Sequence, residues 1–271
     1  MPVAIADCAL AQLGMMDEGP VALIRAAASA GFGAIGLPLR SGALRKLKTE
    51  IVTDAALIRQ IRTALAETSL NVFDVEALVL GHLPPEAELH RLLGTAAELG
   101  ASRISCLGHE PHHGPGDLRP GEAPERLAWL ADLARQHGIR IAVEFMAFRA
   151  VNSLDAAVEL IRASGSGDTG IVVDALHAFR TGATPEKIAA LPPGLISHFQ
   201  ICDARADPAM DLPDEARRDR LLPGEGVVPL AAFLAALPAG TPLSLEIPVA
   251  QLLAQSVAER TAAGAATLAT L

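Results

Sequence analysis

The chain has 271 residues, of which 51% are hydrophobic and 3% aromatic, with no tyrosine. This length suits one α/β barrel, and the apolar fraction is large enough for a closed core. The formal net charge is -9, which excludes the basic footprint that a nucleic-acid-binding protein needs to displace counterions, so we expect no nucleic-acid partner.

The first ten residues show no basic segment followed by a long apolar one, so no signal peptide is expected. No apolar stretch approaches the ~18 residues of a membrane span, so no membrane partner is expected. Cys8, Cys106 and Cys202 lie far apart in or near apolar runs, where we expect reduced core residues. We therefore predict a soluble, cytoplasmic protein.

Short apolar runs alternate with longer helical segments along the whole chain, at spacings of roughly 30 residues, the length of one βα unit. The eight expected strands cover residues 3–10, 34–39, 70–78, 102–108, 140–146, 170–176, 195–203 and 242–248. Expected helices include residues 20–32, 54–68, 124–138 and 153–164. Pro124 stands where a first-turn residue should be, and Asn152 or Ser153 can cap the last of these helices. Trp129 is expected in the core.

Eight strands, each followed by a helix, most simply close into a single (β/α)8 TIM barrel, here over residues 1–271. A doubly wound open sheet is the alternative, but no Gly-rich phosphate loop follows the first strand. Two long loops, residues 108–122 and 204–228, follow strands. We expect both to lie over the catalytic face of the barrel.

Four successive strands carry an oxygen donor near their ends: Glu144, Asp174, Gln200 and Glu246. Active sites of such barrels lie at the carboxyl ends of the strands. Buried carboxylates that converge there would repel one another unless a divalent cation neutralised them. The sequence therefore predicts that these four residues bind a metal ion, and oxygen ligands suit Mn²⁺ or Mg²⁺ and tolerate Co²⁺ or Zn²⁺.

Each of these residues also has a structural explanation when taken alone. Glu144 or Glu246 could pair with Arg140, Asp174 could cap a helix, and Gln200 could be a hydrogen-bonding spacer. The series of four neighbouring strands favours the metal site.

These strand ends resemble those of a known family. Residues 70–250 are similar to the xylose-isomerase-like TIM barrels of the sugar phosphate isomerase/epimerase superfamily. That group includes ketohexose 3-epimerases, hydroxypyruvate isomerase, inosose and 3-dehydroshikimate dehydratases and endonuclease IV. The resemblance is carried by VVDALHAFRTG, HFQICDA, RLLPGEG and LSLEIP. It implies metal binding by Asp174, Gln200 and Glu246, and substrate contact by His177.

Two positions depart from the family pattern. Ketohexose epimerases carry His where this chain has Gln200, whereas hydroxypyruvate isomerase and the dehydroshikimate dehydratases carry Gln. The terminal Glu of the second strand is replaced by Gly36. Both departures disfavour a free-sugar epimerase without affecting the predicted metal site.

The resemblance implies a divalent-metal-dependent isomerase or epimerase that acts on a small sugar or hydroxycarbonyl compound through an enediolate. Glu144 and Glu246 are the predicted catalytic pair, one removing a proton and the other returning it. The alternative is a metal-dependent dehydratase of the 3-dehydroshikimate or inosose type, since both reactions need the same base and metal.

Predicted substrate contacts are His177, Arg220, Arg180, Glu76 and His109. Arg149 and Arg205 also lie on loops over this face and could clamp an anionic group. His198 lies below the metal position or belongs to the core.

His109, His112 and His113 form a lid or a second metal site, or belong to a mobile loop. An endonuclease IV-like activity and a catalytically silent ligand sensor are the remaining hypotheses. A homo-oligomer is compatible with the sequence, which decides neither the substrate nor the metal.

Overall fold

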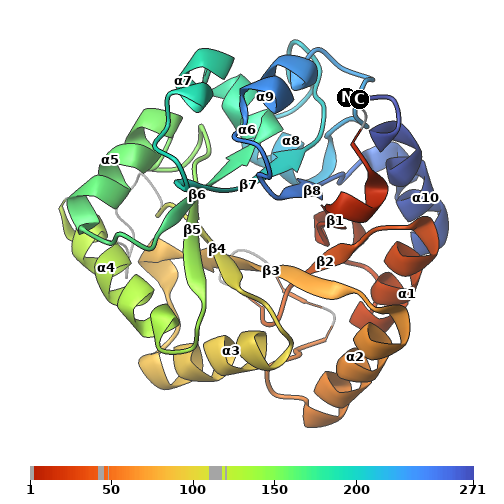
Figure 1. Ribbon diagram of the computed structural model, residues 1–271, viewed down its shortest axis with the longest axis horizontal. Coiled ribbons are helices and arrows are strands. Elements are labelled where there is room, and N and C mark those ends of the chain that lie inside the picture. The colour runs from red at the N-terminus through yellow and green to blue at the C-terminus, as the bar shows by residue number, and fades with distance from the viewer. Residues whose placement is uncertain (1–2, 42–45, 48, 110–117, 120) are drawn as a thin grey trace.

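Eight parallel strands close into a barrel in chain order, so that β1 pairs with β8 as well as with β2 (Figure 1). The structure is a computed structural model that describes residues 3–41, 46–47, 49–109, 118–119 and 121–271. The strands are β1 Cys8–Leu10, β2 Ala34–Leu37, β3 Asn71–Val79, β4 Arg103–Leu107, β5 Arg140–Glu144, β6 Gly170–Asp174, β7 Ile196–Ile201 and β8 Leu243–Leu245. The predicted TIM barrel is confirmed, and the open sheet is excluded.

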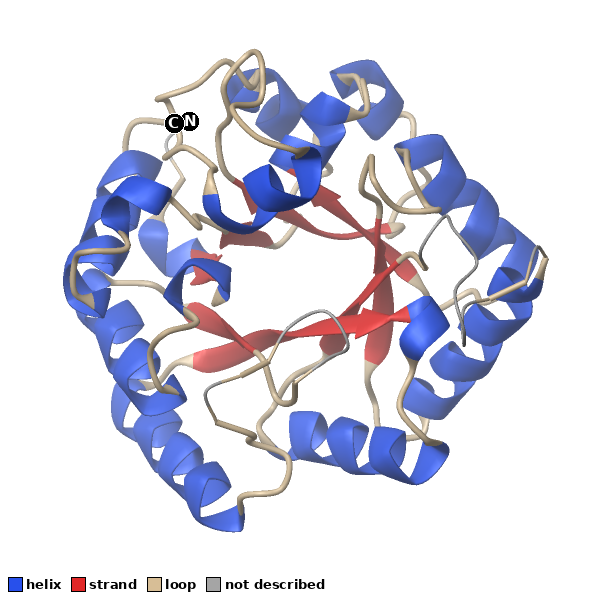
Figure 2. Cartoon of the chain, turned by 180° about the vertical axis from the view of Figure 1, so that it is seen from behind, coloured by secondary structure: helices blue, strands red, loops and turns tan. Residues whose placement is uncertain are grey.

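Helices surround the barrel, as the view from behind shows (Figure 2). The α-helices are α1 Pro20–Ala30, α2 Ala55–Thr68, α3 Glu86–Glu98, α4 Glu122–Arg135, α5 Leu154–Ser164, α6 Ala175–Arg180, α7 Pro185–Ala189, α8 Leu212–Arg218, α9 Leu230–Ala236 and α10 Val257–Leu268. Single 3₁₀ turns are η1 Ile5–Asp7, η2 Leu13–Met15, η3 Leu80–His82 and η4 Ala250–Leu252. None of the helices in the described part of the chain has the length and apolarity needed to cross a membrane.

Local signals set the helix ends. The side chain of Ser153 accepts a hydrogen bond from the backbone N–H of Ala156 at 3.2 Å, which confirms one of the two predicted caps for α5. Helix α4 begins at Glu122, so Pro124 lies inside its first turn as expected. The expected first strand is shorter than predicted, because Ile5–Asp7 forms the turn η1 before β1 starts.

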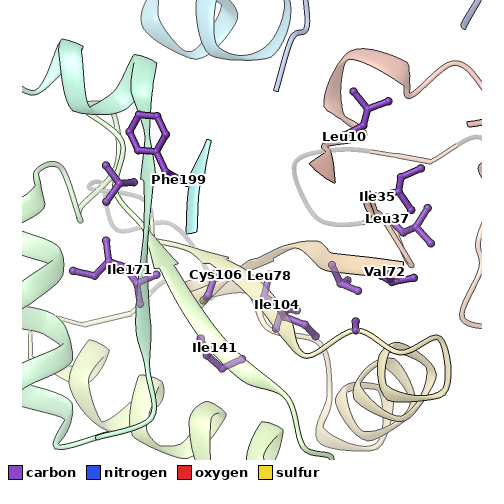
Figure 3. Packing of buried hydrophobic residues seen from close by; sticks show 14 of the residues in the cluster. Leu10, Ile35, Leu37, Val72, Leu78, Ile104, Cys106, Ile141, Ile171 and Phe199 are labelled. Atoms are coloured by element: carbon purple, nitrogen blue, oxygen red, sulfur yellow. The ribbon is translucent and has the colours of Figure 1, made fainter. Parts of the chain in front are cut away.

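Apolar strand residues fill the space between strands and helices. Ile104 and Ile141 are register partners on β4 and β5, both are buried, and Figure 3 shows them on neighbouring strands. Burying a side chain of this size contributes about 1.5–3 kcal/mol. Cys8, Cys106 and Cys202 are buried and free, which confirms the expectation for the cysteines.

The prediction that Trp129 belongs to the core is wrong. Its side chain on α4 is 36% exposed, and the guanidinium of Arg126 lies 6.0 Å from its ring centroid. The helical period places Trp129 beside an apolar face, but the indole lies at the protein surface next to Arg126.

Candidate active site at the carboxyl ends of the strands

The four predicted ligands come together at one end of the barrel. Glu144 and Asp174 are the last residues of β5 and β6, and Asp174 is the register partner of Gln200 on β7. Glu246 follows the last residue of β8, and its backbone N–H donates to the carbonyl of Ile201 on β7 at 2.9 Å. All four side chains are buried. Their convergence follows from parallel strands that end at the same edge.

Arg220 lies between two of these acids. Its Nη1 donates to Asp174 Oδ2 at 2.5 Å, and its Nη2 pairs with Glu246 Oε2 at 2.7 Å. Its Nε donates to the carbonyl of Ala216 at 2.9 Å. Burial would lower the pKa of Arg220, but the two carboxylates raise it well above its usual value. The guanidinium is therefore a fixed positive charge that neutralises part of the acidic cluster.

Asp174 has both of the roles considered for it. Its Oδ1 accepts the backbone N–H of His177 at 3.0 Å and caps α6, while its Oδ2 faces Arg220. Burial on its own would raise the pKa of Asp174, but Arg220 and His177 hold it below the ordinary value. One carboxylate thus ends a strand, starts a helix and carries negative charge into the site.

Glu144 faces a different environment. Its Oε1 lies 3.8 Å from Nε2 of His177, too far for a hydrogen bond. Burial raises the pKa of Glu144 well above its usual value. The carboxylates of Glu246 and Asp174 raise it further, and Arg220 lowers it by less. In the protein as described, Glu144 therefore tends to hold a proton.

His177 is a neutral imidazole at physiological pH. Burial lowers its pKa to about 4, and its Nε2 has no hydrogen-bond partner in the described part of the chain. Phe148 packs edge-on against the ring, with centroids 5.8 Å apart. A neutral ring with an open nitrogen can exchange a hydrogen bond with a bound molecule.

Two amides hold Glu76 in the same region. Gln12 Nε2 and Gln200 Nε2 donate to its two carboxylate oxygens at 3.0 and 2.9 Å. Glu76 lies within β3 and does not end the strand, because β3 continues to Val79. With its amide nitrogen used on Glu76, Gln200 directs its oxygen elsewhere, and that buried Oε1 meets no hydrogen-bond partner among the described residues.

The acids open onto a cavity of about 300 Å³. This is the low end of the range of small-molecule sites, roughly 300–1,000 Å³. The titratable residues that line it are Arg40, Glu76, Glu144, Arg149, His177, Arg217, Arg220 and Glu246. Its apolar wall includes Met16, Leu107, Met146 and Phe148. The size suits a small polar molecule with one apolar side.

The donor chemistry of the four predicted ligands fits a divalent cation. They offer carboxylate and amide oxygens, and the unused Gln200 Oε1 is the type of atom that a cation would satisfy. Within the described ranges, however, no three Asp, Glu, His or Cys side chains are arranged so that they could hold a metal ion. In their place, Arg220 contacts one oxygen of Asp174 and one of Glu246.

The alternative in which Arg140 pairs with a strand-end glutamate is wrong. Arg140 is the first residue of β5, at the end of the strand opposite Glu144. Its guanidinium donates to the carbonyls of Asp168 and Gly194 at 2.9 and 2.7 Å. The partner of Glu246 is Arg220, which is distant in the sequence.

Arg180 does not line the cavity, in contrast to the expectation that it contacts substrate. Its Nε and Nη2 pair with both carboxylate oxygens of Glu215 at 2.9 and 2.5 Å. It also donates to the carbonyls of Ala206 and Arg205, each at 2.8 Å. These contacts connect α6 to α8, so Arg180 positions the helix that covers the site.

The histidines of the 108–122 loop lie outside the cavity wall or outside the described residues. His109 is not among the residues that line the cavity, and its carbonyl accepts the N–H of Ala150 at 3.0 Å. His112 and His113 lie outside the described residues. The other long loop does cover the site, since residues 204–228 include α8 and supply Arg217 and Arg220 to the cavity.

The RLLPGEG segment is held in place by Asp203. Its Oδ1 accepts from the backbone of Val228 at 3.0 Å, and its Oδ2 accepts from Gly224 at 3.0 Å. A Cβ at Gly226 would lie 2.3 Å from an oxygen of Asp203, so only glycine fits there. Asp203 is thus a structural residue that sets the position of Arg220.

A second group of buried polar residues comes from β3, β4 and β7. Ser105 donates to Asp74 Oδ2 at 3.4 Å, and His198 Nε2 lies 3.7 Å from the same oxygen. Burial raises the pKa of Asp74 to about 7 and lowers that of His198 to about 3. A Cβ at Gly36 would approach Asp74 Oδ1 to 2.7 Å. Asp74 therefore fills the space beside Gly36, and this explains why β2 has a glycine at that position.

Residues of the site that were not predicted from the sequence include Gln12, which donates to Glu76, and Arg217, which lines the cavity. Gln12 follows β1 closely and carries the same strand-end signal as the predicted ligands, but the expected strand was placed too early for it to stand out. Arg217 lies on the short helix α8, inside a stretch that was expected to be a loop. No periodic pattern marks it in the sequence.

Known proteins resemble the chain in both sequence and fold. The family model described as xylose isomerase-like TIM barrel matches residues 24–270. The chain is 36% identical over 154 residues to a 3-dehydroshikimate dehydratase of Pseudomonas aeruginosa, covering 55% of this chain and 24% of that protein. It is 33% identical over 115 residues to an inosose isomerase of Bacillus velezensis, covering 42% of this chain and 40% of that protein. The matches thus span less than half of each curated relative.

A solved structure has the same fold over nearly the whole chain. The IOLI protein with a binding zinc atom superposes with a TM-score of 0.78 at 20% identity, covering 96% of this chain and 95% of that one.

Proposed function

The chain belongs to the xylose isomerase-like TIM barrel family, and we propose that it is a metal-dependent enzyme that transfers a proton next to the carbonyl of a small hydroxycarbonyl compound. One observation carries this proposal: Glu144 and Glu246, both buried, line the same small cavity. Two carboxyl groups that reach one cavity can act as base and acid on a single bound molecule.

The residues proposed to hold the cation are Glu144, Asp174, Gln200 and Glu246, whose carboxylates would have to move closer together than they lie in the structure. The unused oxygen of Gln200 supports this set, and the zinc atom of the structurally similar IOLI protein is consistent with it. When bound, a divalent ion acts as a Lewis acid that polarises a carbonyl oxygen. We propose Mn²⁺ or Mg²⁺, with Co²⁺ or Zn²⁺ as substitutes, because the donors are oxygens.

Glu144 and Glu246 then divide the proton transfer. One removes the proton beside the carbonyl, and the other returns a proton to the enediolate. Arg220 contacts one oxygen of Glu246 at 2.7 Å and so fixes the orientation of that carboxylate. His177, neutral and with an open Nε2, can donate to the substrate oxygen on which negative charge develops if that nitrogen carries the proton.

Dehydration is the second candidate reaction. It is favoured by the 36% identity over 154 residues to a 3-dehydroshikimate dehydratase. The first step is the same proton removal, and the outcome depends on whether the substrate has a β-hydroxyl group that can leave. The second carboxyl group then protonates the leaving hydroxyl instead of the carbon.

The test is proton exchange observed by NMR. The purified protein with Mn²⁺ is incubated in D₂O with hydroxypyruvate, free ketohexoses, inosose and 3-dehydroshikimate. We expect deuterium next to the carbonyl of at least one compound, or its dehydrated product, and neither with Glu144→Gln. Absence of exchange and product with every compound, together with no thermal shift on adding Mn²⁺, would favour the ligand-sensor hypothesis instead.

A further inference from the structure

Both acids and arginines line the cavity. Glu144 and Glu246 are buried, whereas Arg217 is exposed and Arg149 is buried, and all four line the same cavity. The arginine that contacts the acids, Arg220, already uses its guanidinium on Asp174 and Glu246. Arg149 and Arg217 are therefore additional positive charges in the wall.

Arg149 is held in a defined position. Its backbone N–H donates to the carbonyl of Met146 at 2.9 Å in the turn after β5. Its guanidinium carbon lies 5.7 Å from the ring centroid of Phe148, within the range of a cation–π contact. Phe148 also packs against His177, so the guanidinium is fixed relative to the proposed catalytic residues.

Arg217 is placed in the wall by its helix. Asp211 caps α8, and Glu215 binds Arg180 through both carboxylate oxygens. The next arginine, Arg218, pairs with Asp214 on the surface. Arg217 itself makes neither a hydrogen bond nor an ion pair within the described chain, although it lines the cavity.

The two guanidinium groups also affect each other. Burial, and to a smaller extent the charge of Arg217, together lower the pKa of Arg149 to about 10. Two positive charges close together in the wall of one cavity attract an anionic group. Arginine is the side chain best suited to bind a carboxylate or a phosphate, because its guanidinium can donate two parallel hydrogen bonds to their oxygens.

We infer that Arg149 and Arg217 bind an anionic group of the substrate while its hydroxycarbonyl end reaches Glu144 and Glu246. The substrate class is then a small hydroxycarbonyl compound that carries a carboxylate or a phosphate, and not a neutral sugar. This inference rests on the proposed function for the position of the reacting end. The cavity of about 300 Å³ limits the molecule to a small one.

The first experiment measures binding alone, without turnover. Lactate, inorganic phosphate and neutral dihydroxyacetone are titrated into the protein at constant ionic strength and followed by NMR. We expect Arg217→Gln and Arg149→Met to weaken binding of the preferred anion at least about tenfold. The matched control Arg218→Gln, next in the chain but outside the cavity wall, should change nothing. The lactate and phosphate titrations decide which anionic group is preferred.

The inference is overturned if Arg217→Gln binds both anions as well as the unmodified protein, or if Arg218→Gln weakens binding equally. Should Arg149→Met fail to fold, the exposed Arg217 decides the result. Proton exchange with neutral ketohexoses only would leave the proposed function standing and refute this inference. If Arg217→Gln loses anion binding but the unmodified protein exchanges protons on none of the compounds, this inference stands and the proposed function is refuted.

Discussion

The two sides of the acidic cluster solve the problem of buried charge differently. On the Arg220 side, Asp174 and Glu246 lie 2.5 and 2.7 Å from a fully buried guanidinium. On the Glu144 side, the nearest basic group is the imidazole of His177 at 3.8 Å, and Gln200 Oε1 has no partner in the described residues. The chain thus neutralises one side itself, while the other side is incomplete without a ligand.

This difference is chemically useful. Asp174, held by Arg220, has a pKa below its usual value, whereas burial raises the pKa of Glu144 and of Glu246 well above the usual value, and Arg220 offsets only part of this rise for Glu246. The incomplete side is where a cation or substrate would gain most from binding. Five substitutions can break or sharpen this comparison.

The largest effect is expected from the glutamates. Glu144→Gln and Glu246→Gln should each reduce proton exchange by about 10²–10⁴-fold, because each removes a group that carries a proton. Their effects on stability should differ. Glu144→Gln should leave the free energy of unfolding unchanged or higher, whereas Glu246→Gln should lower it because Arg220 loses one of two carboxylates. Exchange rates by NMR and urea unfolding measure both, and full activity in either variant refutes its assignment.

Arg220→Met should be the most destabilising change. It leaves Asp174 and Glu246 buried without their cation, and breaking such a pair costs about 3–5 kcal/mol. Arg205→Met is the matched control, because its pair with Asp219 is partly exposed and is expected to contribute about 0–1 kcal/mol. Urea unfolding at pH 7 compares the two. Equal losses would show that Arg220 is not needed to balance the buried acids.

Asp74→Asn tests a buried acid that is neutralised neither by arginine nor by a bound ligand. Its raised pKa keeps the carboxyl group protonated in the folded state. The folded pKa of Asp74 is about 7, above an unfolded value of about 3.9. The folded state therefore binds more protons between these values, and the unmodified protein loses stability as the pH rises through this window. The melting temperature of Asp74→Asn relative to the unmodified protein should rise from pH 4 to pH 7 and level off above. A constant difference across this range would contradict the raised pKa.

Gln200→Ala should have the smallest effect on the fold and a selective effect on metal binding. Even partners of metal ligands change affinity by about tenfold or more, so loss of a ligand should weaken Mn²⁺ binding at least that much. Calorimetric titration with Mn²⁺ gives the affinity, and Gln12→Ala is the control, because it removes the other amide on Glu76 without removing a proposed ligand. Equal affinities in the two variants would remove Gln200 from the metal site.

Much of the site could be predicted from the strand ends. Glu144, Asp174 and Glu246 were identified because parallel strands bring their carboxyl ends to one edge, so polar residues there share a location whatever their distance in sequence. Arg220 was identified in a different way, through the resemblance of the segment RLLPGEG to a family motif. Arg180 was predicted to contact substrate, and the sequence did not show its pair with Glu215, because Glu215 is on a short helix without a periodic signal.

The sequence by itself determined the barrel, because alternating apolar runs and helical segments of nearly constant length favour one architecture. It also determined which strands carry acids. Only the tertiary structure decided which acids are paired, that Arg220 rather than Arg140 is the internal cation, and that Arg149 and Arg217 share one cavity wall. Charge pairing depends on distances of a few ångströms between residues far apart in the chain, and no local pattern records those distances.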